Sequence, residues 1–91
     1  MAMVTLRYWA AAKDAAGVAE DKVEALTLAG ALAAGRAATA ERPGNHAARL
    51  AQVMARSSFL VDGRAAGTRP HESIALSSDS VIEVLPPFAG G

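Results

Sequence analysis

The chain has 91 residues, and its nine basic and nine acidic side chains cancel to a formal net charge of zero. The length corresponds to one domain, and the balanced charge indicates neither nucleic acid nor a membrane surface as a partner. The absence of cysteine excludes disulfides, thiolate metal sites and a cysteine nucleophile, and it fits a cytoplasmic protein. The start of the chain does not have the pattern of a signal peptide, and no apolar stretch is long enough to span a bilayer.

Large apolar side chains are scarce. Alanine supplies much of the 52% hydrophobic content, and aromatic residues make up only 4%. The core is therefore expected to depend on a small set of large residues, namely Trp9, Leu26, Leu32, Leu50, Phe59, Val61, Val84 and Leu85.

The beginning of the chain predicts a strand, a short helix and a second strand. Apolar and more polar residues alternate over residues 4–9, and this period of two indicates a strand. Residues 10–16 are rich in helix formers, and Gly17 is a suitable C-terminal stop. Residues 21–26 alternate loosely and predict a second strand, antiparallel to the first.

The middle of the chain predicts two helices. Thr27 is a suitable N-cap for a helix that begins at Leu28, although Gly30 and Gly35 each weaken a helix by about 1 kcal/mol relative to alanine. The segment 41–45 breaks this helix. A second helix, for which Asn45 is the candidate cap, has an apolar face opposite a polar one, with Leu50, Val53 and Met54 against Arg49, Gln52 and Arg56.

The last third predicts a hairpin and a final strand. Residues 58–61 form a short apolar run, and Asp62-Gly63 is a strong hairpin-turn pair before a return strand at residues 64–66. A polar loop and a brief apolar segment follow. Residues 81–85 are β-branched and mostly apolar, which is typical of a central strand paired on both sides. Together the elements predict an α+β roll, one sheet with helices on one face.

The residue patterns of an internal active site are missing. The glycines fit neither the dinucleotide-binding nor the P-loop spacing. His46 and His71 lie in different loops without a partner at metal-ligand spacing, and no nucleophile elbow surrounds Ser73. Trp9 is better explained as a rim or core aromatic than as a ligand-stacking residue. We therefore expect no metal site and no catalysis by the chain alone.

The last six residues combine a stiff base with a slender end. Two prolines fix their φ angles and favour an extended path, one aromatic residue follows, and two glycines have no side chain that would clash in a channel. Six residues at ~3.1 Å each reach roughly 19 Å. We expect a mobile tail over residues 86–91 on a domain of residues 1–85, with the order Pro86, Pro87, Phe88, Ala89, Gly90, Gly91.

The carboxylate of Gly91 is the best remaining reactive group. A carboxylate is a poor electrophile, but an acyl-adenylate formed with ATP has a good leaving group. A sulfur nucleophile would then convert it into a thiocarboxylate. This chemistry needs an activating enzyme, and it needs no cysteine in the carrier itself.

Three segments carry a resemblance to a known family. Residues 4–17 are similar to its opening strand and aromatic-alanine helix, residues 59–63 to its mid-chain strand ending in Asn-Gly, and residues 81–91 to its last strand. The Pro-Pro-x-x-Gly-Gly ending is typical of one branch. The chain thus resembles the ubiquitin-like (β-grasp) sulfur carriers, most of all the small subunit of molybdopterin synthase. It departs from the pattern at Trp9 (usually phenylalanine), Lys13 (usually arginine) and Asp79-Ser80 (usually Gly-Asp).

The resemblance implies the β-grasp fold, with a mixed sheet of four to five strands, and a carrier that is not an enzyme on its own and binds no cofactor. It implies that Gly91 is adenylated and then thiocarboxylated, that Gly90 is needed for threading, and that Phe88 contacts the partner. The implied partners are an activating enzyme that uses ATP and resembles the ubiquitin-activating enzymes, and the large synthase subunit. In that subunit a cyclic pyranopterin would receive the sulfur.

Three other interpretations stay open. The chain could be a protein modifier joined through Gly91 to lysines of target proteins, since the same activation serves both roles. It could be a sulfur carrier for thiazole or cysteine synthesis, although those carriers usually lack the double proline. It could also be a small binding module in which the Gly-Gly ending is accidental.

Overall fold

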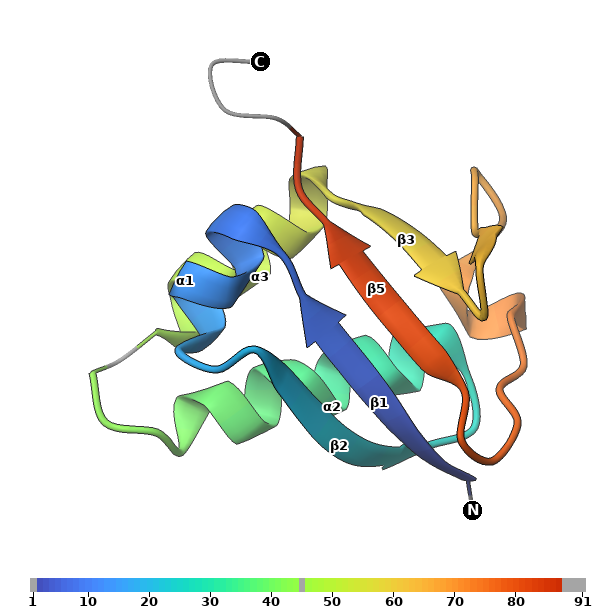
Figure 1. Cartoon of the computed structure of the whole chain (residues 1–91), viewed down its shortest axis with the longest axis horizontal. Helices are drawn as coiled ribbons and strands as arrows, with labels where there is room; N and C mark the ends of the chain where they lie inside the picture. Colours follow the sequence, from blue (N-terminus) through green and yellow to red (C-terminus); the bar gives the residue numbers. More distant parts are fainter. Residues whose placement is uncertain (1, 45, 88–91) are drawn as a thin grey trace.

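The computed structural model describes residues 2–44 and 46–87. Within them five strands form one mixed sheet in the order β2-β1-β5-β3-β4, with helices packed on one face (Figure 1). The strands are β1 (Ala2–Tyr8), β2 (Glu20–Ala25), β3 (Ser58–Val61), β4 (Arg64–Ala65) and β5 (Val81–Leu85). The helices are α1 (Ala10–Ala16), α2 (Leu28–Ala40), α3 (Ala47–Arg56) and the 3₁₀ turn η1 (His71–Ser73). The predicted α+β roll is confirmed; η1 lies in what was predicted as a polar loop.

β5 is the middle strand of the sheet. It pairs with β1 in parallel, with Leu6 opposite Ile82 and Tyr8 opposite Val84, and with β3 in the antiparallel direction on its other side. The prediction that residues 81–85 form a central strand is therefore confirmed, as is the antiparallel pairing of β1 with β2. Because β1 and β5 are parallel, both strands end at the same edge of the sheet (Figure 1).

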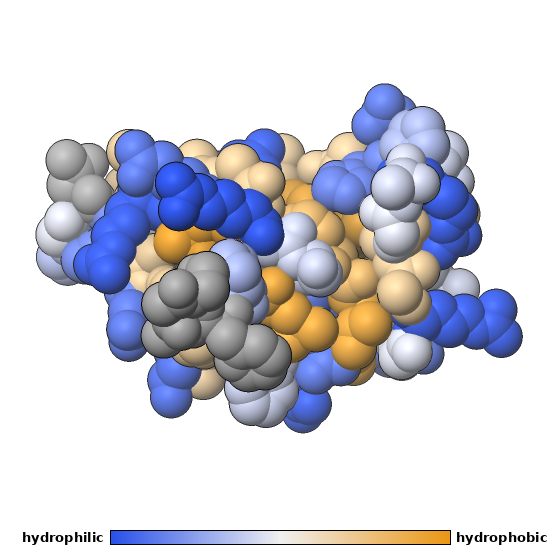
Figure 2. All heavy atoms as spheres, turned by 90° about the horizontal axis from the view of Figure 1, so that it is seen from above, coloured by the Kyte–Doolittle hydropathy of each residue, from blue (hydrophilic) through white to orange (hydrophobic). Residues whose placement is uncertain are grey.

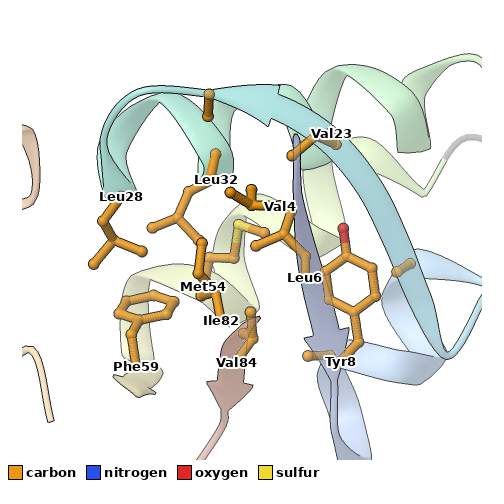
Figure 3. Packing of buried hydrophobic residues seen from close by; sticks show 14 of the residues in the cluster. Val4, Leu6, Tyr8, Val23, Leu28, Leu32, Met54, Phe59, Ile82 and Val84 are labelled. Carbon is orange, nitrogen blue, oxygen red and sulfur yellow. The ribbon is translucent and has the colours of Figure 1, made fainter. Parts of the chain in front are cut away.

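The inward side chains of β1 and β5 form the centre of the core. Val4, Leu6, Ile82 and Val84 are at most 1% exposed, and they face side chains of α2 and α3 (Figure 3). Burying each such side chain contributes about 1.5–3 kcal/mol. Half of the eight candidate core residues are buried as predicted, namely Leu32, Leu50, Phe59 and Val84.

The core prediction is wrong for Trp9 and Leu26, whereas Val61 and Leu85 are half-buried. Trp9 is 47% exposed and Leu26 is 63% exposed. Each of the two directly follows a buried strand residue, and neighbours in extended backbone point to opposite faces of a sheet. Trp9 has the extended angles φ −115° and ψ 149°, so burial of the preceding tyrosine turns the indole outward.

The predicted turn residues adopt the backbone conformations that their turns require. Gly17 ends α1 with φ 81°, and its N–H donates to the carbonyl of Lys13 at 2.9 Å. Asp62 and Gly63 both have positive φ, 51° and 82°, as a two-residue hairpin turn requires. The Asp62 carboxylate also accepts a hydrogen bond from the backbone N–H of Val81 at 2.9 Å, so it joins the hairpin to the start of β5. Asn45, the predicted helix cap, lies outside the described residues.

The two glycines of α2 have different surroundings. Thr27 caps the helix as predicted, its hydroxyl oxygen accepting a hydrogen bond from the N–H of Gly30 at 3.1 Å. A Cβ atom added at Gly30 would lie 3.4 Å from that oxygen. A Cβ atom at Gly35 would lie 2.6 Å from Leu6 Cδ1 and 2.7 Å from the Tyr8 hydroxyl oxygen. The absence of a side chain at Gly35 thus allows α2 to pack this closely against β1.

We predict that Gly35→Ala lowers the free energy of unfolding by about 1–3 kcal/mol through overpacking, although alanine is the better helix former. Gly30→Ala, the matched control in the same helix, should leave stability unchanged or slightly raised. Urea unfolding followed by circular dichroism measures both. Equal midpoints for the two variants would contradict the close contact at Gly35.

Candidate functional site

The candidate site begins where the chain leaves the sheet. Pro86 is half-buried and Pro87 is exposed. The strand that leads to them is held on both sides, since Leu85 lies opposite Ser58 of β3 and the carbonyl of Val84 accepts a hydrogen bond from the backbone N–H of Trp9 at 3.3 Å. The other tail residues lie outside the described residues, so the mobile tail over residues 86–91 stays a prediction, as do the roles of Phe88, Ala89, Gly90 and Gly91.

An apolar strip lies beside this exit, on the sheet face opposite the helices. It consists of the exposed Trp9 and the half-buried Leu60 and Leu85; we call it the tail-side strip. Glu83 of β5 adds a negative charge next to this strip. It lies opposite Leu60 of β3 on one side and opposite Arg7 of β1 on the other. Figure 2 views the end of the molecule from which the chain leaves, and apolar surface is open there among hydrophilic side chains.

Trp9 also borders a shallow hollow together with Arg7, Lys13 and Glu20. Arg7 Nε lies 3.7 Å from Glu20 Oε2, and both side chains are about half exposed. An exposed pair of this kind contributes little to stability. The hollow therefore adds aromatic surface and charged groups next to the point where the chain leaves the sheet. Trp9 was expected to be either a rim or a core aromatic, and it is a rim residue.

A network of polar side chains joins this end of the sheet to the helices. The Tyr8 hydroxyl donates a hydrogen bond to Asp21 Oδ2 at 2.8 Å, and Arg42 forms an ion pair with the other oxygen of that carboxylate. The Arg42 guanidinium also donates to the carbonyl of Ala16 and to the Thr39 hydroxyl, both at 2.8 Å. One side chain thus joins β2 to the ends of α1 and α2.

The sequence alone does not predict this network. Asp21 and Arg42 are 21 positions apart, and Arg42 stands in a segment that was interpreted only as a break between helices. A polar residue beside a helix end is a weak signal by itself, so no local pattern singles out the pair.

The surroundings of Tyr8 change its acidity. Burial above all, and then the hydrogen bond to Asp21, raise the pKa of the Tyr8 phenol well above its ordinary value of 10.0. Both effects disfavour the phenolate, because an anion loses solvation on burial and would be repelled by the carboxylate.

The acidic side chains, the histidines and Ser73 are the other candidate reactive groups. Among residues 2–44 and 46–87, no three His, Cys, Asp or Glu side chains are grouped so that they could hold a metal ion. The hydroxyl of Ser73 donates to the carbonyl of Pro70 at 2.6 Å. In the same residues no helix has the length and apolar character needed to cross a membrane.

Several solved structures have the same fold. The solution structure of small archaeal modifier protein 1 (SAMP1) from Methanosarcina acetivorans has a TM-score of 0.78 at 19% identity, covering 100% of this chain and 98% of that chain. The crystal structure of SAMP1 from Haloferax volcanii has a TM-score of 0.75 at 21% identity, covering 98% and 99%. The fold is the ubiquitin-like β-grasp.

A chain in the complex of subunits 1 and 2 of molybdopterin-converting factor from Helicobacter pylori is also similar, with a TM-score of 0.61 at 21% identity over 98% of this chain and 99% of that chain. No protein-family model matches the sequence, and no curated protein matches it significantly. The β-grasp fold implied by the sequence resemblance is thus confirmed for the described residues.

We predict that stability falls as the pH rises above about 10, where an unfolded tyrosine ionises but the folded Tyr8 phenol stays protonated. The stabilisation from this shift is complete below the unfolded pKa and is lost as the pH rises through the higher folded pKa. Tyr8 is the only tyrosine in the chain, so Tyr8→Phe removes the effect while other titrating groups remain. Urea unfolding of both proteins at about pH 8 and about pH 11 tests this; identical pH slopes would contradict it.

Proposed function

We propose that the protein is a cytoplasmic sulfur carrier for molybdopterin synthesis. The observation that carries this proposal is the position of the Gly-Gly ending, which follows the central strand of a ubiquitin-like sheet after a double proline. A carboxylate at Gly91 would stand on a base fixed by two neighbouring strands. The chain is then the sulfur-carrying subunit of an enzyme complex, and its partners supply the catalytic groups.

The proposed chemistry has three steps. In an activating enzyme, the Gly91 carboxylate attacks the α-phosphorus of ATP, and pyrophosphate leaves. A hydrosulfide equivalent supplied by that enzyme system then displaces AMP and leaves a thiocarboxylate. In the large synthase subunit the thiocarboxylate sulfur would form a C–S bond to a cyclic pyranopterin while a C–O bond of the attacked carbon breaks, and the displaced oxygen would take up a proton. Hydrolysis of the resulting acyl–sulfur bond leaves the sulfur on the pterin and regenerates the carboxylate.

The tail-side strip is the proposed contact with these partners. A protein that encloses the tail must approach the sheet at Pro86, and Trp9, Leu60 and Leu85 are the apolar side chains beside that point. Tryptophan is a typical anchor of protein interfaces, and the apolar side chains around such an anchor help to exclude water from the contact. The similar chain from Helicobacter pylori belongs to a complex of two subunits, which supports a large-subunit partner for this chain.

A second candidate function is protein modification. The two SAMP1 structures, which are described as small archaeal modifier proteins, have the higher TM-scores, 0.78 and 0.75 against 0.61. A modifier would use the same adenylate but transfer the Gly91 acyl group to a lysine of a target protein. Sulfur carriers for thiazole or cysteine synthesis would share the thiocarboxylate and differ in the acceptor.

We predict that incubation with a cognate activating enzyme, ATP and a sulfur donor replaces one oxygen of this chain by one sulfur. Intact-mass spectrometry detects the exchange, and fragmentation places it at Gly91. A chain that lacks Gly91 should keep its fold and gain no sulfur. Adding a molybdopterin synthase large subunit and a cyclic pyranopterin should return the mass to its original value.

Two outcomes would change the proposal. No sulfur gain with any cognate activator would contradict the sulfur-carrier function. Isolation of lysine-linked adducts through Gly91, with no sulfur transfer to the pterin, would instead support the modifier function.

We predict that Leu60→Lys, within the tail-side strip, weakens binding to the large subunit at least about tenfold, because the contact would place an unpaired charge among apolar side chains. The control is Leu26→Lys, since Leu26 is 63% exposed and lies at the opposite end of the sheet, where β2 ends. Isothermal titration calorimetry with the purified large subunit measures both variants. Equal affinity losses, or no loss for Leu60→Lys, would exclude the strip as the contact surface.

A further inference from the structure

A groove of about 500 Å³ opens between α2, α3 and the β3–β4 hairpin. Its lining includes Leu32, Arg36, Met54, Phe59, Leu60 and His71. The volume is in the range of small-molecule sites, about 300–1,000 Å³. Leu60 borders both this groove and the tail-side strip, whereas Leu32, Arg36, Met54, Phe59 and His71 belong to the groove and not to the strip. The occupant of the groove is therefore a question separate from the partner contact at the tail.

The floor of the groove is apolar. Leu32, Met54 and Phe59 come from α2, α3 and β3, and their side chains converge in the core (Figure 3). All three are nearly buried, at 5–6% exposure, so the surface that they present to the groove is preformed by the packing around it. The thioether of Met54 is flexible and adapts to groups of different shape.

The guanidinium of Arg36 places a positive charge beside this apolar floor. Arg36 is half-buried, and its Nη1 atom lies 3.6 Å from the sulfur of Met54, a weak acceptor. Within residues 2–44 and 46–87, Arg36 forms no ion pair, and no carboxylate lines the groove. A guanidinium has five N–H donors in a fixed planar arrangement, so most of the hydrogen-bonding capacity of Arg36 is open to a ligand.

His71 adds a second polar group on the other wall. Its ring packs edge-to-face against Phe59, with centroids 5.1 Å apart and an interplanar angle of 84°. This contact orients the imidazole, and His71 lines the same groove as Arg36. The groove thus combines an apolar floor, an arginine without an ion-pair partner among the described residues, and a histidine ring that can donate an N–H hydrogen bond.

We propose that this groove binds a small organic anion that carries an aromatic or branched aliphatic group. The carboxylate of the ligand pairs with Arg36, whose planar donors match its two oxygens, and the apolar group lies over Met54 and Phe59. The lining contains the positive charge of Arg36 and no acidic side chain, so its charge is complementary to that of an anion. The concave shape between three elements favours a small molecule over a flat protein surface.

The test uses the full chain labelled with ¹⁵N, titrated with phenylacetate as the probe and with the neutral phenylacetamide as its isostere. Phenylacetate should cause saturable shifts in the amide signals of Arg36, Met54 and Phe59, and phenylacetamide should bind at least about tenfold more weakly because it lacks the charge. Arg36→Gln should lose the same factor for phenylacetate. Arg49→Gln, on the exposed face of α3, is the matched control and should bind like the parent chain.

Several results would overturn the proposal. These are no saturable shifts at the groove, equal binding of the amide, or unchanged affinity in Arg36→Gln with a native-like spectrum. The same shifts with inorganic phosphate alone would show a simple anion site. Shifts with a short apolar-acidic peptide but not with phenylacetate would assign the groove to a protein partner.

Discussion

The parallel pairing of β1 with β5 is the contact on which the rest of the structure depends. It joins strands from the two ends of the sequence, Ala2–Tyr8 and Val81–Leu85, at the centre of the sheet. Its register places Leu6 and Ile82, both fully buried, side by side in the core. Because parallel strands end at the same edge, the exit of the chain from β5 lies beside Trp9. A tail that followed an edge strand would have a neighbouring strand on one side only, whereas β5 is paired with β1 on one side and with β3 on the other.

The helical layer is tied to the same strands by two contacts at Tyr8. The bare backbone of Gly35 lets α2 approach the tyrosine ring, and the tyrosine hydroxyl donates to Asp21, which Arg42 neutralises. A charge in such a half-buried position is costly unless it is paired and hydrogen-bonded, and here both partners are. The network fixes β2 and the ends of α1 and α2 relative to β1, so the end of the sheet that presents the tail is held from behind.

Local patterns in the sequence predict most of the elements, because strand alternation, caps and tight turns depend on adjacent residues. The hairpin turn at Asp62-Gly63, where both residues have positive φ, is an example. The core prediction is wrong for Trp9 and Leu26 for the same reason: both are large and apolar, but the phase of the strand alternation points both side chains outward. The Arg42 network and the Arg36 groove could not be predicted, since each joins residues from separate elements that only the folded chain brings together. For the candidate site the sequence supplied the tail residues, and the structure supplied the fixed base and the apolar strip next to it.

The central claim is that the Gly91 carboxylate is the group that a partner enzyme activates. Exchange of labelled pyrophosphate into ATP by a cognate activating enzyme measures this step directly, before any sulfur or lysine chemistry. We predict exchange that depends on this chain and is lost when one residue is added after Gly91. Equal exchange with the extended chain, or none with the unmodified one, would contradict the claim.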